Sequence, residues 1–269
     1  MNRAAERYGP VDEPGARAAR TCALAVFAKA PSPRGVKTRL VPPLTFDEAA
    51  ALHACFLKDT AESIMAVSDT APCAGVAVYT PERAKPLFGE LFPPDFTLVL
   101  QRGDGFGERL SSAVADVLAA GYASVCLIGS DSPTLPPAVL ADAAAALARP
   151  GERVVLGPAD DGGYYLIGLT ALHARLFQGI AWSTDRVLAE TIERAREVEL
   201  DVELLPRWYD VDDGASLCRL CEELFGDGQS IAAPSAYRAA HSRRYLAQLM
   251  RLGPERIWPQ RATGGQRSS

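Results

Sequence analysis

Four short stretches of the sequence carry charged side chains directly beside apolar segments. They are residues 27–40 (FAKAPSPRGVKTRL), 130–133 (SDSP), 157–169 (GPADDGGYYLIGL) and 207–213 (RWYDVDD). The first stretch supplies cations, which bind phosphate groups, and the other three supply carboxylates, the preferred ligands of hard divalent cations. Side chains of these two kinds are what a complex of magnesium with a polyphosphate requires.

The stretch 27–40 combines two prolines and a glycine with the cations Arg34, Lys37 and Arg39. Exposed backbone N–H groups and cations in such a loop can wrap a polyphosphate. The Walker pattern is absent, so this is not a P-loop. A basic surface loop is the alternative interpretation. The positions that we expect to bind a nucleotide here are Ala28, Lys29, Ala30, Gly35, Lys37 and Arg39.

Asp131 stands two residues before Pro133, immediately after an apolar run. Proline removes a backbone donor and ends the strand ladder, so the chain leaves the sheet there and Asp131 faces the crevice beyond it. One or two carboxylates together with substrate phosphates are enough to hold Mg²⁺. The alternative is an Asx turn that caps the helix expected near Pro136.

Two further carboxylate clusters have similar settings. Asp160 and Asp161 precede the glycine pair Gly162 and Gly163, where a backbone without side chains can approach a ligand closely. An Asp-Gly hairpin turn is the alternative there. The stretch 207–213 offers Asp210, Asp212 and Asp213, for which the alternative is capping of a helix that starts before Ala215.

The elements that must position these residues alternate along the chain. Strands are predicted at 22–28, 75–79, 96–100, 124–129, 153–157, 164–169 and 200–205. Helices are predicted at 46–67, 81–91, 107–120, 136–148, 184–198, 214–225 and 234–252. This order predicts an α/β domain with a mostly parallel sheet and helices on both faces. Since ligands bind beyond the carboxyl ends of such strands, the four stretches are expected on one edge.

Composition limits the class of protein. The formal net charge of −5 disfavours a nucleic-acid partner, although seven arginines against two acids make residues 227–269 basic. No apolar run has the ~20 residues of a membrane span. Six scattered cysteines fit reduced thiols in a cytoplasmic protein. Residues 1–20 are interpreted as a disordered lead, 21–226 as the main domain, and 227–269 as a helical extension with a basic tail.

Six motifs in order and spacing give the sequence a resemblance to a known family. FAKAPSPRGVKTRL, QRGDGFGERL, LIGSDSPTLP, GPADDGGYYLIGL, AWSTDRVL and WYDVDD resemble bacterial GT-A-fold proteins labelled as glycosyltransferases of arsenosugar-biosynthesis type. The match spans roughly residues 22–225. The superfamily includes the molybdenum-cofactor and 2-phospholactate guanylyltransferases. The resemblance implies a Rossmann-like mixed sheet, metal ligation by Asp131 and Asp212, and nucleotide binding that extends to Asp104 and Gly105.

The leading functional hypothesis is a glycosyltransferase that uses Mg²⁺ or Mn²⁺, a nucleotide-sugar donor and a small-molecule acceptor. Asp131 and Asp212 bind the ion, and Asp161 is the catalytic base or orients the acceptor. The acceptor-binding residues are predicted to be Gly162, Gly163, Trp182 and Ser183. Two alternatives stay open: a nucleotidyltransferase that joins an NTP to a phosphorylated or hydroxylated small molecule, and a non-catalytic nucleotide-binding protein.

Two expectations about stability follow from the same hypothesis. Lys37→Ala should hardly change the stability of the ligand-free protein, because a cation on an exposed loop has little to lose. Removing the charge of Asp131 or Asp212 should leave that stability level or raise it slightly, because carboxylates crowded without their metal repel each other.

Overall fold

A seven-stranded sheet forms the centre of the molecule. In the computed structural model, which describes residues 21–226 and 237–257, the strand order is β3-β2-β1-β4-β6-β5-β7. The strands are β1 (Cys22–Lys29), β2 (Cys73–Thr80), β3 (Thr97–Leu100), β4 (Ser124–Gly129), β5 (Arg153–Pro158), β6 (Tyr164–Leu169) and β7 (Asp201–Leu204). Only β6 runs antiparallel to its neighbours among these strands. The predicted α/β class with a mixed, mostly parallel sheet is confirmed.

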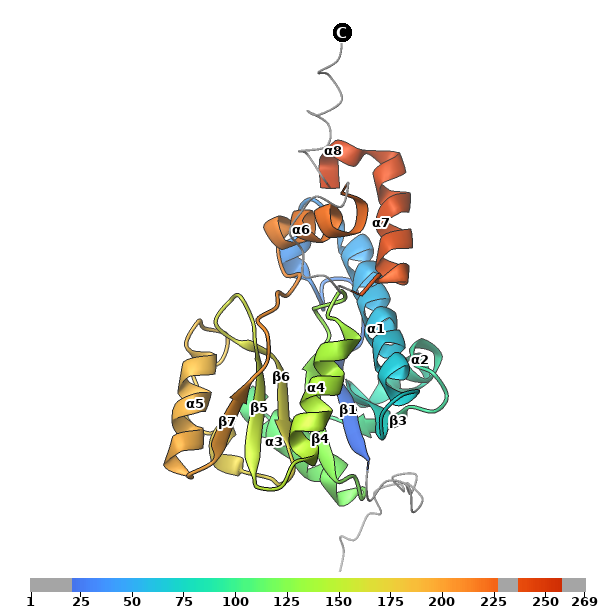
Figure 1. Cartoon of the computed structure of the whole chain (residues 1–269). Helices are drawn as coiled ribbons and strands as arrows, with labels where there is room; N and C mark the ends of the chain where they lie inside the picture. Colours follow the sequence, from blue (N-terminus) through green and yellow to red (C-terminus); the bar gives the residue numbers. More distant parts are fainter. Residues whose placement is uncertain (1–20, 227–236, 258–269) are drawn as a thin grey trace, which may run out of the picture.

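Helices cover both faces of this sheet (Figure 1). They are α1 (Phe46–Ser68), α2 (Lys85–Leu91), α3 (Phe106–Ala119), α4 (Pro137–Ala148), α5 (Val187–Glu197), α6 (Gly214–Phe225), α7 (Ala240–Leu252) and α8 (Pro254–Ile257). Three-residue and four-residue 3₁₀ turns occur at η2 (Thr38–Leu40), η3 (Glu82–Ala84) and η4 (Ala174–Phe177).

Alternate residues of β1 enter different layers of the core. Leu24 and Val26 pack on the face covered by α1 and α4, whereas Ala23 and Ala25 pack on the face covered by α3. All four side chains are fully buried. A strand with both faces buried reads as a continuous apolar run, and this is why CALAVFA shows no polar alternation.

The C-terminal helices lie beyond the carboxyl ends of the strands, at the top of Figure 1. Helix α7 packs against α1 through the buried residues Ser242, Leu246 and Leu249. The helix predicted at 234–252 starts later than expected, because Ala239 takes a left-handed backbone conformation with φ of 41°. The lead at 1–20, residues 227–236 and the tail from 258 lie outside the described residues.

Among the described residues, no helix combines the length and the apolar character that crossing a bilayer requires. The six cysteines are free thiols.

Candidate functional site

The ammonium group of Lys37 lies between two of the predicted carboxylates. Its Nζ is 2.6 Å from Asp131 Oδ1 and 2.8 Å from Asp212 Oδ1, and it donates a further hydrogen bond of 2.9 Å to the carbonyl of Val211. The ammonium group thus donates hydrogen bonds to Val211 O and Asp212 Oδ1 and forms an ion pair with Asp131. The lysine side chain is 4% exposed. The expectation that Lys37 is an exposed loop cation is therefore wrong.

Backbone geometry turns Lys37 inward. Arg34 and Lys37 both adopt left-handed conformations, with φ of 63° and 49°. Non-glycine residues rarely hold this conformation, and each instance costs on the order of 1–3 kcal/mol. The loop thus bends twice between β1 and η2. These bends direct the Lys37 side chain toward the ends of the strands.

Asp212 reaches Asp131 although β7 and β4 are not neighbours in the sheet. The segment after β7 continues parallel to the end of β5 and hydrogen-bonds to it. Leu205 N–H donates to Leu156 O and Trp208 N–H to Pro158 O. Val211 N–H then donates to Asp131 O at 2.8 Å. This last bond places the side chain of the next residue, Asp212, beside Asp131.

The charges of this cluster support one another. Burial would lower the pKa of Lys37, but Asp131 and Asp212 outweigh it and the pKa lies above its ordinary value. Burial would likewise raise the pKa of Asp131, but Lys37 outweighs it and holds that pKa below its usual range. Lys37 thus compensates one of the two carboxylate charges, and Arg39, which pairs with Asp212, compensates the other. The expectation that they repel each other in the metal-free protein is wrong.

Arg39 and His53 also lie beside the two carboxylates. The Arg39 guanidinium donates to Asp212 Oδ2 at 3.0 Å and is 72% exposed. His53, on α1, lies with Nε2 3.1 Å from Lys29 O, so Nε2 carries the proton and Nδ1 is the acceptor. Nδ1 is buried without a hydrogen-bond partner and lies 3.8 Å from Asp131 Oδ1. Burial lowers the pKa of His53, which keeps the ring neutral.

Sequence reasoning missed His53 because it lies inside a helix and not at a strand end. The one available signal was that the chain has only three histidines.

A basic cavity of about 320 Å³ opens beside this cluster. Its lining includes four cationic side chains and two carboxylates: Lys29, Lys37, Arg39, Arg109, Asp131 and Asp212. Gly35 also lines it, and a side chain there would collide with Ser32 Oγ at 2.3 Å. The excess of positive charge makes this cavity complementary to an anion such as a polyphosphate.

Four predicted nucleotide-binding residues lie away from this lining. Ala28 is buried in β1, and Ala30 N–H extends the ladder to Thr80 O. Asp104 and Gly105 precede α3, where both N–H groups donate to Glu108 Oε2. As far as the described residues show, none of the four contributes to the basic cavity.

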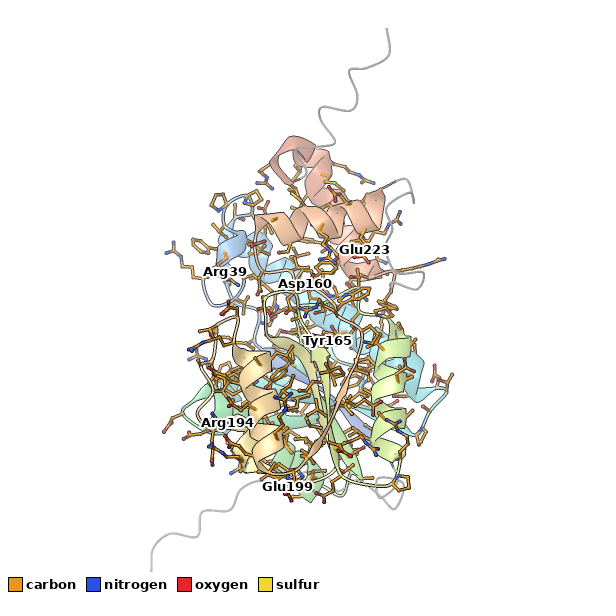
Figure 2. The ribbon with its side chains drawn as sticks, turned by 60° about the vertical axis from the view of Figure 1, so that its left-hand side comes forward. Arg39, Asp160, Tyr165, Arg194, Glu199 and Glu223 are labelled. Carbon is orange, nitrogen blue, oxygen red and sulfur yellow. The ribbon has the colours of Figure 1, made fainter. Side chains whose placement is uncertain are left out.

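An acidic cavity of about 650 Å³ lies on the other side of Asp212. Its lining includes six carboxylates and two guanidinium groups: Asp160, Asp161, Asp185, Asp210, Asp212, Asp213, Arg39 and Arg219. The two arginines are each paired with an aspartate of the lining, Arg39 with Asp212 and Arg219 with Asp160. Arg39 and Asp160 lie between the C-terminal helices and the sheet (Figure 2).

Asp210 is a further carboxylate to which sequence reasoning assigned no role. The Ser132 hydroxyl donates to its Oδ1 at 2.5 Å. Burial, with smaller contributions from the neighbouring Asp131, Asp212 and Asp161, raises the pKa of Asp210 to about 7. The motif WYDVDD contained the signal, but spacing alone does not tell which of its three aspartates is buried.

Asp213 caps α6 by accepting from Ser216 N–H at 2.9 Å, as the alternative interpretation had it.

Asp161 lines the acidic cavity, and the glycine pair that follows it shapes the turn that holds it there. Asp161 Oδ1 accepts a 2.8 Å hydrogen bond from Gly163 N–H, which fixes the orientation of the carboxyl group. Gly162 has φ of 89°, and a Cβ there would lie 2.2 Å from Asp185 O. Only glycine fits at this position, so the pair is a tight structural turn that also presents Asp161 to the cavity.

Trp182 and Ser183 line a third, aromatic cavity of about 360 Å³, and Ser183 also lines the acidic cavity. The Trp182 ring packs edge-on against Phe106, with ring centroids 5.0 Å apart. Phe106 is 42% exposed, which is unusual for phenylalanine. Ser183 holds a left-handed conformation with φ of 64°. Asp131, Asp161 and Asp210 line the aromatic cavity as well, so the cavities share their carboxylates.

The oxygen atoms around the Lys37 ammonium fit a divalent cation. Two carboxylate oxygens and one backbone carbonyl already converge on a single positive centre. Such an oxygen set suits Mg²⁺, and the buried Nδ1 of His53 is an additional acceptor that Mn²⁺ tolerates. The donor set therefore fits the ion that the sequence led us to expect.

A second group of potential ligands joins α1 to α7. Asp59, Glu62 and His241 bring their ligand atoms within 4.8 Å of one another. Asp59 accepts hydrogen bonds from the N–H groups of His241 and Ser242, and Glu62 accepts from Tyr237 and pairs with His241. These bonds fasten the N-terminus of α7, and this role accounts for the cluster.

Comparison with known proteins relates the chain to a bacterial family. A family model described as an uncharacterized protein conserved in bacteria (DUF2064) matches residues 63–184. A protein of Desulfovibrio desulfuricans G20, provisionally named a nucleotide-diphospho-sugar transferase, is 30% identical, with 84% of this chain and 98% of that chain covered and a TM-score of 0.70. No curated protein matches the sequence.

A more distant structure shares the fold. A cytidylyltransferase from Leptospira borgpetersenii serovar Hardjo-bovis (strain JB197) is 12% identical, with 90% of this chain and 98% of that chain covered and a TM-score of 0.51. Since the chain spans nearly all of the Desulfovibrio protein at 30% identity, it belongs to the same family as that protein, and it has the fold of nucleotide-diphospho-sugar transferases.

Proposed function

We propose that this protein is a metal-dependent glycosyltransferase that takes a nucleotide-sugar donor and a small-molecule acceptor. One observation carries the proposal: a basic cavity and an acidic cavity meet at Asp212, next to the cluster of Lys37 and Asp131. The donor diphosphate fits the basic cavity, because phosphate oxygens are complementary to its cations. The acceptor fits the acidic side.

The acidic cavity distinguishes between the two candidate reactions. Six carboxylates line it, and its two arginines are engaged by two of them. A phosphorylated acceptor, which some nucleotidyl transfers need, meets like charge there, and this mismatch costs several kcal/mol. A neutral polyol or an amine meets hydrogen-bond acceptors instead. The lining thus favours transfer of a sugar to an uncharged or cationic acceptor.

The reaction requires one bond to form and one to break. The acceptor hydroxyl oxygen bonds to the anomeric carbon of the sugar, and the bond from that carbon to the phosphate oxygen breaks, releasing a nucleoside diphosphate. Asp161 takes the hydroxyl proton, because its carboxyl group is held at the rim of the acidic cavity. Trp182 provides an apolar wall for the sugar.

Asp131, Asp212 and the Val211 carbonyl are the residues that would hold the divalent ion. When bound, such an ion stabilises the negative charge that develops on the departing diphosphate. Arg39 lies beside Asp212 and is mostly exposed, so its guanidinium can turn to the phosphates at little cost.

Nucleotidyl transfer is the second candidate. The excess of cations in the basic cavity also suits a triphosphate, which carries more charge than the diphosphate of a nucleotide sugar. The products separate the two reactions, because nucleotidyl transfer releases pyrophosphate and glycosyl transfer releases a nucleoside diphosphate.

The first experiment is a thermal-shift screen of the full chain with NTPs and nucleotide sugars, with and without Mg²⁺ or Mn²⁺. A ligand that binds only the folded state raises the melting temperature. Stabilisation by a nucleotide sugar plus metal, followed by nucleoside diphosphate release with polyol or amine acceptors, supports the proposal. Pyrophosphate release from an NTP would replace it by the second candidate, and the lack of any metal-dependent nucleotide shift would overturn both.

A further inference from the structure

The Lys37 ammonium occupies the position where a divalent ion would bind. Its nitrogen lies 2.6 Å from Asp131 Oδ1, 2.8 Å from Asp212 Oδ1 and 2.9 Å from Val211 O. These are the oxygens that converge on one centre, and a divalent ion binds such oxygens at about 2.0–2.6 Å. The ammonium group and the ion therefore cannot hold these atoms at the same time.

We infer that Lys37 is a built-in substitute for the metal, so that metal ion and phosphate bind as a coupled pair. This inference rests on the proposed function, because it uses the same two carboxylates. Binding of the ion displaces the ammonium group from its three oxygens. The displaced ammonium then needs another anionic partner, and the basic cavity that Lys37 lines is where a polyphosphate would supply one.

Burial makes this displacement costly when the ion arrives alone. The Lys37 side chain is 4% exposed and lies 5.6 Å from the centroid of the Phe56 ring. An ammonium group that loses its partners in such surroundings carries a large desolvation penalty. Metal alone is therefore expected to bind weakly, whereas metal with polyphosphate gives the ammonium a new partner. The device keeps the carboxylates neutralised between turnovers and reserves the metal site for a phosphate-bearing ligand.

The effect of removing Lys37 on metal binding and on polyphosphate binding distinguishes a substitute for the ion from other roles of the lysine. A lysine that only contacts phosphate weakens polyphosphate binding when it is removed and leaves the binding of metal alone unchanged. A lysine that is only structural weakens both. A lysine that substitutes for the ion gives opposite signs, because its removal frees the carboxylates for the metal but deprives the phosphate of a partner.

The experiment titrates Mn²⁺ alone, and preformed Mn²⁺–tripolyphosphate, into the full chain, with calorimetry or the paramagnetic resonance of free Mn²⁺ as readout. The variants are Lys37→Met, which keeps much of the length without charge, and Lys37→Gln, which keeps two donors. Lys85→Met is the matched control, since Lys85 is exposed at the start of α2.

The expected result for both Lys37 variants is Mn²⁺ affinity at least about tenfold above that of the wild type, since an ammonium bound by two carboxylates no longer competes. The affinity for Mn²⁺–tripolyphosphate is expected to fall, and Lys85→Met should change neither value. Asp131→Asn should remove the gain when it is added to Lys37→Met.

Unchanged or weaker binding of Mn²⁺ alone in the Lys37 variants overturns the inference. If a variant folds only when Mn²⁺ is added, the inference is supported, because the ion then takes the place of the ammonium. If neither variant folds with or without Mn²⁺, the ammonium is a permanent structural cation and the inference is wrong. The proposed function fails separately, when the wild type shows no binding of nucleotides with metal.

Discussion

Lys37 and Arg39 share Asp212 but differ in their surroundings. Lys37 Nζ is 2.8 Å from Asp212 Oδ1 and its side chain is 4% exposed, whereas Arg39 contacts Oδ2 at 3.0 Å and is 72% exposed. Breaking a buried ion pair strands a charge away from water, but breaking an exposed one returns both groups to solvent. Two neighbouring cations on one loop should thus affect stability very differently.

Lys37→Ala is expected to lower the free energy of unfolding of the metal-free protein by about 1–3 kcal/mol, less than for a fully buried pair, because the carboxylates left behind, Asp131 and Asp212, are 36% and 34% exposed. Arg39→Ala should lower it by less than about 1 kcal/mol. Urea unfolding followed by circular dichroism measures both values. Equal, small losses in the two variants would show that the Lys37 cluster is open to water in solution.

Asp131→Asn and Asp212→Asn are expected to abolish the metal-dependent thermal shift caused by nucleotides. Each keeps the shape of the side chain but removes the charge that a hard cation needs. The double variant should be little worse than either single one, because ligands of one ion act as a unit. Asp142→Asn, on the exposed face of α4, is the matched control. Additive losses would assign the two aspartates to separate sites.

The predicted elements and the edge on which the charged stretches meet agree with the structure. Apolar runs mark the strands and prolines mark their ends, and both can be read from neighbouring residues in the sequence. The pairing of Lys37 with Asp131 could not be predicted that way. It depends on the left-handed backbone of Lys37. It also depends on the path of the segment after β7, which crosses to the end of β4, where Val211 N–H donates to Asp131 O. A spacing rule finds charged residues at strand ends, but burial of a lysine between them is a property of the assembled fold.

Asp161→Asn is expected to lower turnover by about 10²–10⁴, the range for loss of a general base, with little change in nucleotide affinity. Gly163 N–H still donates to the amide oxygen, so the turn should persist. Calorimetric nucleotide binding and initial rates of nucleoside diphosphate release separate the two effects. Asp142→Asn is the control, because Asp142 is exposed on α4 and lines none of the three cavities. Full activity of Asp161→Asn would move the role of base to another carboxylate.

Glu62 gives a pH dependence at the contact between α1 and α7. Burial alone would raise its pKa, but hydrogen bonds from His241 and Tyr237 outweigh it and the pKa lies below the ordinary value of 4.5. A depressed pKa stabilises the folded state above about pH 4.5, and this contribution is lost as the pH falls through the folded-state value. Since Glu62 is 47% exposed, the effect should be below about 1 kcal/mol. Wild type and Glu62→Gln should differ at pH 5.5, and the difference should shrink as the pH falls below 4.5.

Asp59 is expected to matter far more than Glu62 for the attachment of α7. Asp59 is fully buried and accepts hydrogen bonds of 2.8 Å from the N–H groups of both His241 and Ser242. Asp59→Asn replaces one acceptor oxygen by an NH₂ group, which then faces a buried donor. Loss of hydrogen bonds to a charged group costs about 1.5–3 kcal/mol each, so the loss of stability should lie in this range.

Hydrogen exchange locates the effect of Asp59→Asn. Amides of α7 should exchange faster in the variant, whereas amides of β1 and β4 should keep their protection relative to global unfolding, because opening of one peripheral helix is a local event. Glu62→Gln, one helical turn away on α1, controls for any change of charge at this contact. Equal acceleration in α7 and in the central strands would show instead that α7 unfolds only together with the sheet, and that residues 240–252 are an integral part of one cooperative domain.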